Sequence, residues 1–106
     1  MKLHIVFDKN GDKVGDLDSM EYALSKLRLV ENSEQELQVN VANGLVIYCF
    51  RLLVKQGKIK SSELLFYNKS TDKDLKKPIY IDIKGEISEY PIGFLDAYSY
   101  ILSQLI

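Results

Sequence analysis

Glycine and lysine in one loop are the residue types that most often hold the phosphates of a nucleotide. In a P-loop, Gly-x-x-x-x-Gly-Lys-Ser/Thr lets bare backbone amides wrap the phosphates while the lysine reaches the outer ones. The sequence has six glycines, and none is followed by Lys-Ser or Lys-Thr in that register. Lys69-Ser70 lacks the glycines that should precede it, and there is no dinucleotide-binding fingerprint. We therefore expect no nucleotide hydrolysis and no cofactor.

Alternating acidic and amide side chains near the amino terminus could bind calcium. Asp8, Asn10 and Asp12 are spaced like the first ligands of an EF-hand loop. Such a loop also needs a glycine at its sixth position and a glutamate at its twelfth. Those positions hold Lys13 and Ser19. The segment is therefore interpreted as a turn, and no metal site is predicted.

The chain has one histidine, His4, and one cysteine, Cys49. His4 lies in an alternating strand pattern, where a partly buried or edge imidazole is more common than a general base. Cys49 lies in an apolar run and is interpreted as a small buried hydrophobe rather than a nucleophile. We assign no catalytic residue. A small hydrolase that uses His4 or the acidic amino-terminal loop is a weaker alternative.

Basic residues are concentrated between Arg51 and Lys84, although the net charge of the whole chain is only −1. Arg51, Lys55, Lys58 and Lys60 could form a weak patch that faces the phosphates of a nucleic acid. The alternative is a solvated, lysine-rich helix end and loop.

Hydrophobic periodicity predicts the elements that position these side chains. The predicted strands are residues 2–7, Glu36–Val41, 63–67 and 79–83, and residues 13–15 are either a short return strand or a loop. The predicted helices are Ser19–Val30, a second from Asn43 or Gly44 to about Gln56, and a third over residues 94–105. Together they predict one α/β domain over residues 1–106, with a small sheet of about four to five strands, the first strands parallel, three helices and a possible C-terminal hairpin at residues 84–88.

Two helix ends carry specific signals. Asp18 and Glu21 have the spacing of a capping box at the start of the first helix. Gly57 is placed to end the second helix in a left-handed conformation.

No segment has the character of a membrane anchor or a secretion signal. The longest uncharged stretch, residues 37–50, falls short of the ~20 apolar residues that a membrane helix needs. The amino terminus is charged too early for a signal peptide. We therefore expect a cytoplasmic protein without membrane contact.

The second half of the chain carries an ordered series of motifs. They are Arg51-Leu52-Leu53-Val54-Lys55-Gln56-Gly57-Lys58-Ile59, then Glu63-Leu64-Leu65-Phe66-Tyr67, and finally Pro78-Ile79-x-Ile81-Asp82-x-x-Gly85-Glu86-Ile87-Ser88-Glu89-Tyr90-Pro91-x-Gly93-Phe94. Residues 45–96 thereby resemble the carboxy-terminal region of bacterial AAA/ABC-type ATPases of the SMC and overcoming-lysogenisation-defect class. In that family the last motif ends in Trp-Pro-x-Gly-Phe, so Tyr90 replaces a tryptophan.

The resemblance has implications for the first half of the chain. Residues 3–8 would be the Walker B strand, with Asp8 as the metal-binding acid, and residues 37–41 would be the switch strand. Lys9 follows Asp8 where a catalytic carboxylate is expected. Residues 40–43, Asn-Val-Ala-Asn, stand where the family has a segment like Glu-Thr-His-Ser. The resemblance thus implies an ATPase-like architecture without the catalytic set.

Two functions follow as hypotheses. The first is a non-catalytic protein-interaction or regulatory module, which binds a partner protein or a second copy of itself. Its candidate interface is the broad apolar surface of the last helix together with Tyr90, in the segment before it, although this helix could instead close a small core. The interface residues are Tyr90, Phe94, Leu95, Tyr98, Ile101 and Leu102. The alternative is an accessory subunit that completes a nucleotide- or DNA-binding site in a partner chain, with phage defence as one setting.

Overall fold

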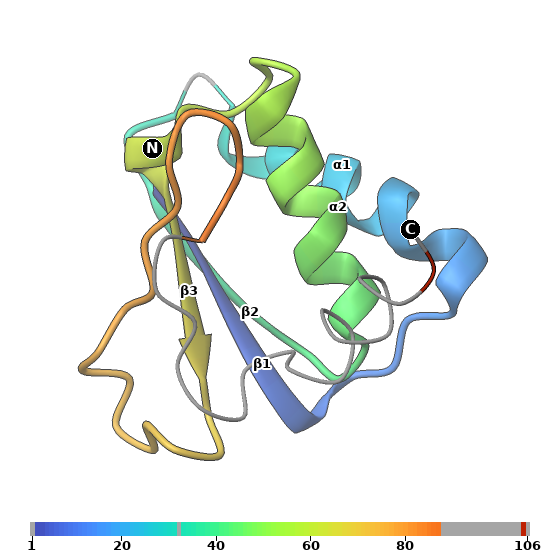
Figure 1. Ribbon diagram of the computed structural model, residues 1–106, viewed down its shortest axis with the longest axis vertical. Helices are drawn as coiled ribbons and strands as arrows, with labels where there is room; N and C mark the ends of the chain where they lie inside the picture. Colours follow the sequence, from blue (N-terminus) through green and yellow to red (C-terminus); the bar gives the residue numbers. More distant parts are fainter. Residues whose placement is uncertain (1, 32, 88–104, 106) are drawn as a thin grey trace.

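The computed structural model describes residues 2–31, 33–87 and 105 (Figure 1). Its elements in chain order are strand β1 (Lys2–Asp12), a 3₁₀ turn (Asp16–Asp18), helix α1 (Ser19–Val30), strand β2 (Glu36–Val41), helix α2 (Gly44–Lys55), a second 3₁₀ turn (Ser61–Glu63) and strand β3 (Leu64–Asn68).

The three strands form one parallel sheet in the order β2-β1-β3. Leu3 of β1 lies opposite Leu37 of β2 and Leu64 of β3. The α/β class and the parallel pairing of the first strands are therefore confirmed. The described part of the chain has three strands and two α-helices, rather than four to five strands and three helices. Most of the predicted third helix, and the end of the predicted hairpin, lie outside the described residues.

The segment predicted as a fourth strand is not a strand. It contributes only two isolated antiparallel bridges, Phe66 with Ile79 and Ile81 with Ile87. The Asp82 carboxylate accepts hydrogen bonds from the N–H groups of Lys84 (2.8 Å) and Glu86 (3.0 Å). This local bonding turns the chain so early that the ladder cannot extend.

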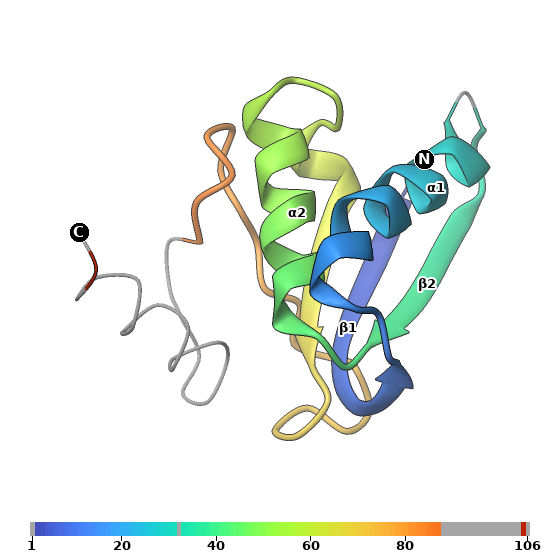
Figure 2. The ribbon, with the colours of Figure 1, turned by 90° about the vertical axis from the view of Figure 1, so that its right-hand side faces the viewer.

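The short return strand predicted at residues 13–15 is not present either. Instead β1 continues through an irregularity after Phe7 until Asp12, which pairs with Val41. The Asp12 carbonyl accepts a hydrogen bond from the Ala42 N–H at 2.9 Å. The end of β1 therefore curls past the end of β2 (Figure 2).

Both helices lie on the same face of the sheet (Figure 2). The core between them and the sheet is built from apolar residues that recur with the period of each element. It includes Leu3 and Ile5 of β1, Ala23 and Leu27 of α1, and Phe50 of α2. The opposite face carries a smaller cluster of Val6, Leu65 and Tyr67, against which Leu75 packs.

This arrangement fixes the handedness of the connections. Because β2 and β3 flank β1 on opposite sides, two helices on one face require crossovers of opposite hand. The Lys2 N–H bonds toward β2, at Gln35, whereas the Phe7 carbonyl bonds toward β3, at Lys69. The side chains of Leu3 and Ile5 in β1 face the helices. For L-residues these bonds then put β2 to the left of β1 when the helices are in front and the strands point up. Figure 2 shows the same arrangement with the strands pointing down, so that β2 is on the right. The β1–α1–β2 crossover is thus left-handed, against the preference of about 98% for right-handed crossovers.

The predicted ends of the helices are partly correct. The α1 boundaries match the prediction, but the side chain of Asp18 makes no capping hydrogen bond. Asp18 already has helical angles, because a 3₁₀ turn leads into the helix. Gly57 follows α2 with φ of +76°, as predicted. Asn43 caps α2 through its side-chain oxygen, which accepts from the Leu45 N–H at 3.0 Å.

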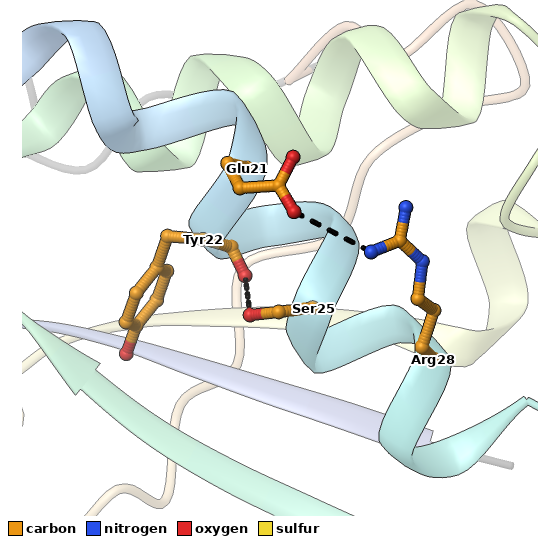
Figure 3. A network of polar contacts seen from close by, with 4 residues as sticks. All are labelled: Glu21, Tyr22, Ser25 and Arg28. Carbon is orange, nitrogen blue, oxygen red and sulfur yellow. Dashed lines mark hydrogen bonds and ion pairs between the residues drawn. The ribbon is translucent and has the colours of Figure 1, made fainter.

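The exposed side of α1 is held by short polar contacts (Figure 3). Ser25 donates its hydroxyl to the Tyr22 carbonyl at 2.7 Å, and Arg28 lies 3.4 Å from the Glu21 carboxylate. The Tyr22 hydroxyl donates to Asp12 at 2.7 Å. Burial, and then this bond to Asp12, raise the pKa of Tyr22. The tyrosine thereby fastens α1 to the end of β1.

Two further expectations can be compared with the structure. Cys49 is half-buried, and burial raises the pKa of its thiol, in keeping with a packing role. Neither described helix has the length and apolar character to cross a membrane.

Candidate binding site at the carboxyl edge of the sheet

A crevice of about 680 Å³ opens where the three parallel strands end. Ligands of open α/β sheets bind outside the carboxyl ends of the strands, so this is the expected place for a site. The lining comes from β1 around its irregularity after Phe7, from the residue that follows β2, and from the last residue of β3 with the loop after it. It consists of Phe7, Asp8, Lys9, Asn10, Ala42, Asn68, Lys69, Ser70 and Lys73.

Among the described residues of that lining, Asp8 is the only one with an acidic side chain. One carboxylate oxygen accepts the Asn10 N–H at 2.9 Å, and the other accepts the Asn40 side-chain amide at 3.0 Å. The bond from the Asn10 backbone, then the bond from Asn40, and the nearby charges of Lys69 and Lys9 lower the pKa of Asp8. The carboxylate is therefore ionised near neutral pH, with both oxygens engaged by the fold.

Three lysines make the crevice electropositive. Lys9 follows Asp8, whereas Lys69 and Lys73 come from the loop after β3. The Lys69 ammonium donates to the Lys73 carbonyl at 2.7 Å, which holds this loop against itself. Three positive charges and one negative charge give the lining a net charge of +2.

Asn68 lies at the end of β3 and is only 3% exposed. Its side-chain oxygen accepts from the Ser70 N–H at 3.3 Å and from the Ser70 hydroxyl at 2.9 Å. Because a backbone N–H can only donate, these bonds establish which end of the amide is oxygen. The amide nitrogen is buried without a hydrogen-bond partner. A buried, unused donor costs free energy, so it is expected to serve a purpose.

The loop after β3 is ordered by Asp72 and Leu75. The Asp72 carboxylate accepts the Lys76 N–H at 2.9 Å and the Lys77 N–H at 2.8 Å. The bond from the Lys76 backbone is the main cause that lowers the pKa of Asp72. Leu75 has a left-handed backbone, with φ of +53°, and packs on the far face of the sheet. The loop thus carries Lys69 and Lys73 to the crevice on a constrained backbone.

The predicted basic patch is only partly assembled. Arg51 and Lys55 line a smaller pocket of about 240 Å³ at the far end of α2, together with Lys84. Lys58 and Lys60 are exposed, but they do not line that pocket. The Arg51 Nε donates to the Gly85 carbonyl at 2.7 Å.

That bond gives Arg51 a structural role. Its guanidinium also lies over the Tyr48 ring, 5.1 Å from the ring centre. Arg51 therefore holds the turn at Gly85 against α2.

His4 lies on the far face of the sheet, away from the helices. Its Nδ1 is 3.0 Å from the Tyr67 hydroxyl, and its Nε2 is 3.5 Å from the Glu36 carboxylate. The second contact is an ion pair only when the imidazole is protonated, and it is not aligned as a hydrogen bond. Burial is the main cause that raises the pKa of Tyr67. The structure places His4 in this cluster, not in the crevice with Asp8.

Three side chains of the crevice, Asn68, Lys69 and Lys73, were missed by the sequence analysis. The available signal was the position of Asn68 at the end of a buried apolar strand. The candidate interface residues Tyr90, Phe94, Leu95, Tyr98, Ile101 and Leu102 lie outside the described residues.

We compared the chain with protein-family models, curated proteins and solved structures. The chain matches no protein-family model, no curated protein and no solved structure.

Proposed function

We propose that the protein is a non-catalytic binding and regulatory module that holds a ligand at the carboxyl edge of its sheet without converting it. The observation that carries this proposal is the state of Asp8. Both of its carboxylate oxygens are engaged by Asn10 and Asn40. Each oxygen keeps a second lone pair, but the two bonds fix the carboxylate, and the described lining of the crevice holds no second carboxylate that could complete a Mg²⁺ site or activate water beside it.

The neighbours of Asp8 support the same conclusion. Lys9 stands next to it, and an ammonium group cannot take a proton from water as a carboxylate does. The end of β2 supplies the Asn40 amide, and the segment after β2 supplies Asn43, which caps α2. In this proposal the resemblance to ATPase tails concerns the architecture, while the chemistry of hydrolysis has been lost.

A second candidate function is an accessory subunit that completes a nucleotide- or DNA-binding site in a partner chain. The net positive lining of the crevice favours it, since phosphates are attracted to such a surface. In both candidates a protein partner or a second copy engages the last helix. That part of the proposal is based on the sequence alone.

Manganese binding tests the central proposal. We expect 0.1 equivalent of Mn²⁺ to broaden no particular group of backbone NMR signals near Asp8. Broadening centred on Asp8, Lys9 and Asn40 that disappears in Asp8→Asn would show an available metal site and contradict the proposal. Asp74→Asn is the matched control, because it removes an exposed acid from the neighbouring loop and leaves Asp72, which orders that loop, in place.

The partner surface has its own test. Light scattering of the wild type and of Leu102→Asp should show a change in mass or in solubility if the last helix binds another molecule. If the protein is a monomer and Leu102→Asp changes neither its mass nor its solubility, the last helix is not an interface and that part of the proposal is wrong.

A further inference from the structure

The crevice has the size and composition of a small-molecule site. Its volume of about 680 Å³ falls in the usual range of ligand pockets, roughly 300–1,000 Å³. Phe7 and Ala42 supply apolar wall, and the lysines surround it with positive charge. An extended nucleic-acid surface would instead spread its basic residues along one face.

The unpartnered Asn68 amide identifies what the site needs. Its nitrogen can only donate, so its missing partner is an acceptor. The Ser70 N–H and hydroxyl already bond the amide oxygen, so the nitrogen is the part of Asn68, a residue of the crevice lining, that has no partner among the described residues. An acceptor that is drawn in by Lys9, Lys69 and Lys73 carries negative charge.

Resting on the proposed function, we infer that the crevice binds a phosphate-bearing small molecule. The lysines Lys9, Lys69 and Lys73 neutralise the phosphate, a phosphate oxygen accepts from the Asn68 amide at the floor, and the organic part lies against Phe7 and Ala42. Asp8 opposes the anion, but the three lysines outweigh its single charge. Its oxygens are also bonded to Asn10 and Asn40, so its charge is partly compensated.

The first test is an NMR titration with inorganic phosphate at constant ionic strength. The side-chain NH₂ signals of Asn68 and the backbone signals of Lys69 and Ser70 should shift together and saturate. Adenosine monophosphate should shift the same signals and, in addition, those of Phe7 and Ala42. Shifts confined to Arg51, Lys55 and Lys84 would move the anion site to the far end of α2 and overturn the inference.

Asn68→Asp is the sharpest variant, because it keeps the oxygen that Ser70 bonds and replaces the donor with a negative atom. Phosphate should bind about tenfold more weakly or worse, since a hydrogen bond to a charged group is lost. Gln35→Glu makes the same change from amide to acid at an exposed position before β2, at the opposite end of the sheet, and should leave the affinity within about twofold. An unchanged affinity in Asn68→Asp would contradict the assignment of the site.

A second pair of variants does not depend on a buried position. Lys69→Ala with Lys73→Ala should weaken phosphate binding by about tenfold, whereas Lys55→Ala with Lys58→Ala should not. If both double variants lose phosphate affinity equally, the loss comes from the change in net charge and not from the crevice, and the inference is overturned.

A short DNA oligonucleotide separates the remaining alternative. If it binds far more tightly than adenosine monophosphate, and Asn68→Asp has no effect on it, the ligand is a nucleic acid and the inference is wrong. Failure of phosphate to bind overturns this inference alone, whereas Mn²⁺ at Asp8 overturns the proposed function.

Discussion

At the scale of the residue, Asp8 shows how one carboxylate can tie neighbouring strands together. It follows the regular part of β1 at the edge where an enzyme would use it. Asn40, at the end of β2, instead donates to it at 3.0 Å and ties the two strands together. The lowered pKa of Asp8 is the measurable consequence of these bonds.

The pH dependence of folding should reveal this role. A depressed pKa in the folded state means that the stabilisation is present above the unfolded pKa of about 3.9 and is lost as pH falls through the folded value. The free energy of unfolding of wild type should therefore exceed that of Asp8→Asn near pH 6, and the difference should shrink below about pH 4. Urea unfolding at several pH values measures it, and a difference independent of pH would contradict the account.

Two glycines allow backbone strain and steric contact to be separated. Gly57 and Gly85 both have φ of +76°, but a Cβ at Gly57 would touch nothing, whereas one at Gly85 would collide with the Arg51 carbonyl. Gly57→Ala should cost about 1 kcal/mol from the left-handed backbone. Gly85→Ala should cost a further 1–3 kcal/mol, on the order of an overpacked site. Equal midpoints of urea unfolding for Gly57→Ala and Gly85→Ala would show that the turn at Gly85 moves to accommodate a Cβ, and would contradict this prediction.

At the scale of the element, the amino end of α2 depends on Asn43. Its oxygen caps the Leu45 N–H, and its amide donates to the Val14 carbonyl at 2.9 Å and to Asp16 at 2.7 Å. It thereby joins α2 to the segment between β1 and α1.

Asn43→Ala should lower the free energy of unfolding by about 1–2 kcal/mol. Asn43→Ser keeps a capping oxygen and loses the long reach, so we expect it to recover part of the loss. Thermal unfolding of the three proteins measures both steps. A serine variant as unstable as the alanine variant would assign the whole effect to the bonds with Val14 and Asp16.

Some elements could be predicted from the sequence, for physical reasons that differ between them. The boundaries of α1 and β2 match because each carries its full apolar period and a clear break on both sides. The extension of β1 to Asp12 was missed, since the Asp8–Asp12 segment has turn chemistry and its pairing with Val41 is long-range. The strand predicted at residues 79–83 has the alternation of a strand, but the Asp82 carboxylate bonds the backbone N–H groups of Lys84 and Glu86 and turns the chain before a ladder can form.

At the scale of the whole molecule, the left-handed crossover determines what each face of the sheet does. It puts α1 and α2 on one face, where they bury the larger core. The carboxyl ends of all three strands then meet at the crevice. Neither the handedness nor the meeting of Lys9 with Lys69 and Lys73 could be predicted, because both arise from contacts between distant segments. The sequence places Lys9 directly after Asp8, and the structure places that lysine in the crevice.

The most direct test of the account is the ³¹P NMR spectrum of ATP with an equal amount of protein and Mg²⁺, followed for a day. The account predicts that the phosphate signals shift or broaden on binding, and that no inorganic phosphate appears beyond a buffer control. Steady release of inorganic phosphate that is lost in Asp8→Asn would contradict it, because Asp8 would then take part in the hydrolysis that the proposed function excludes.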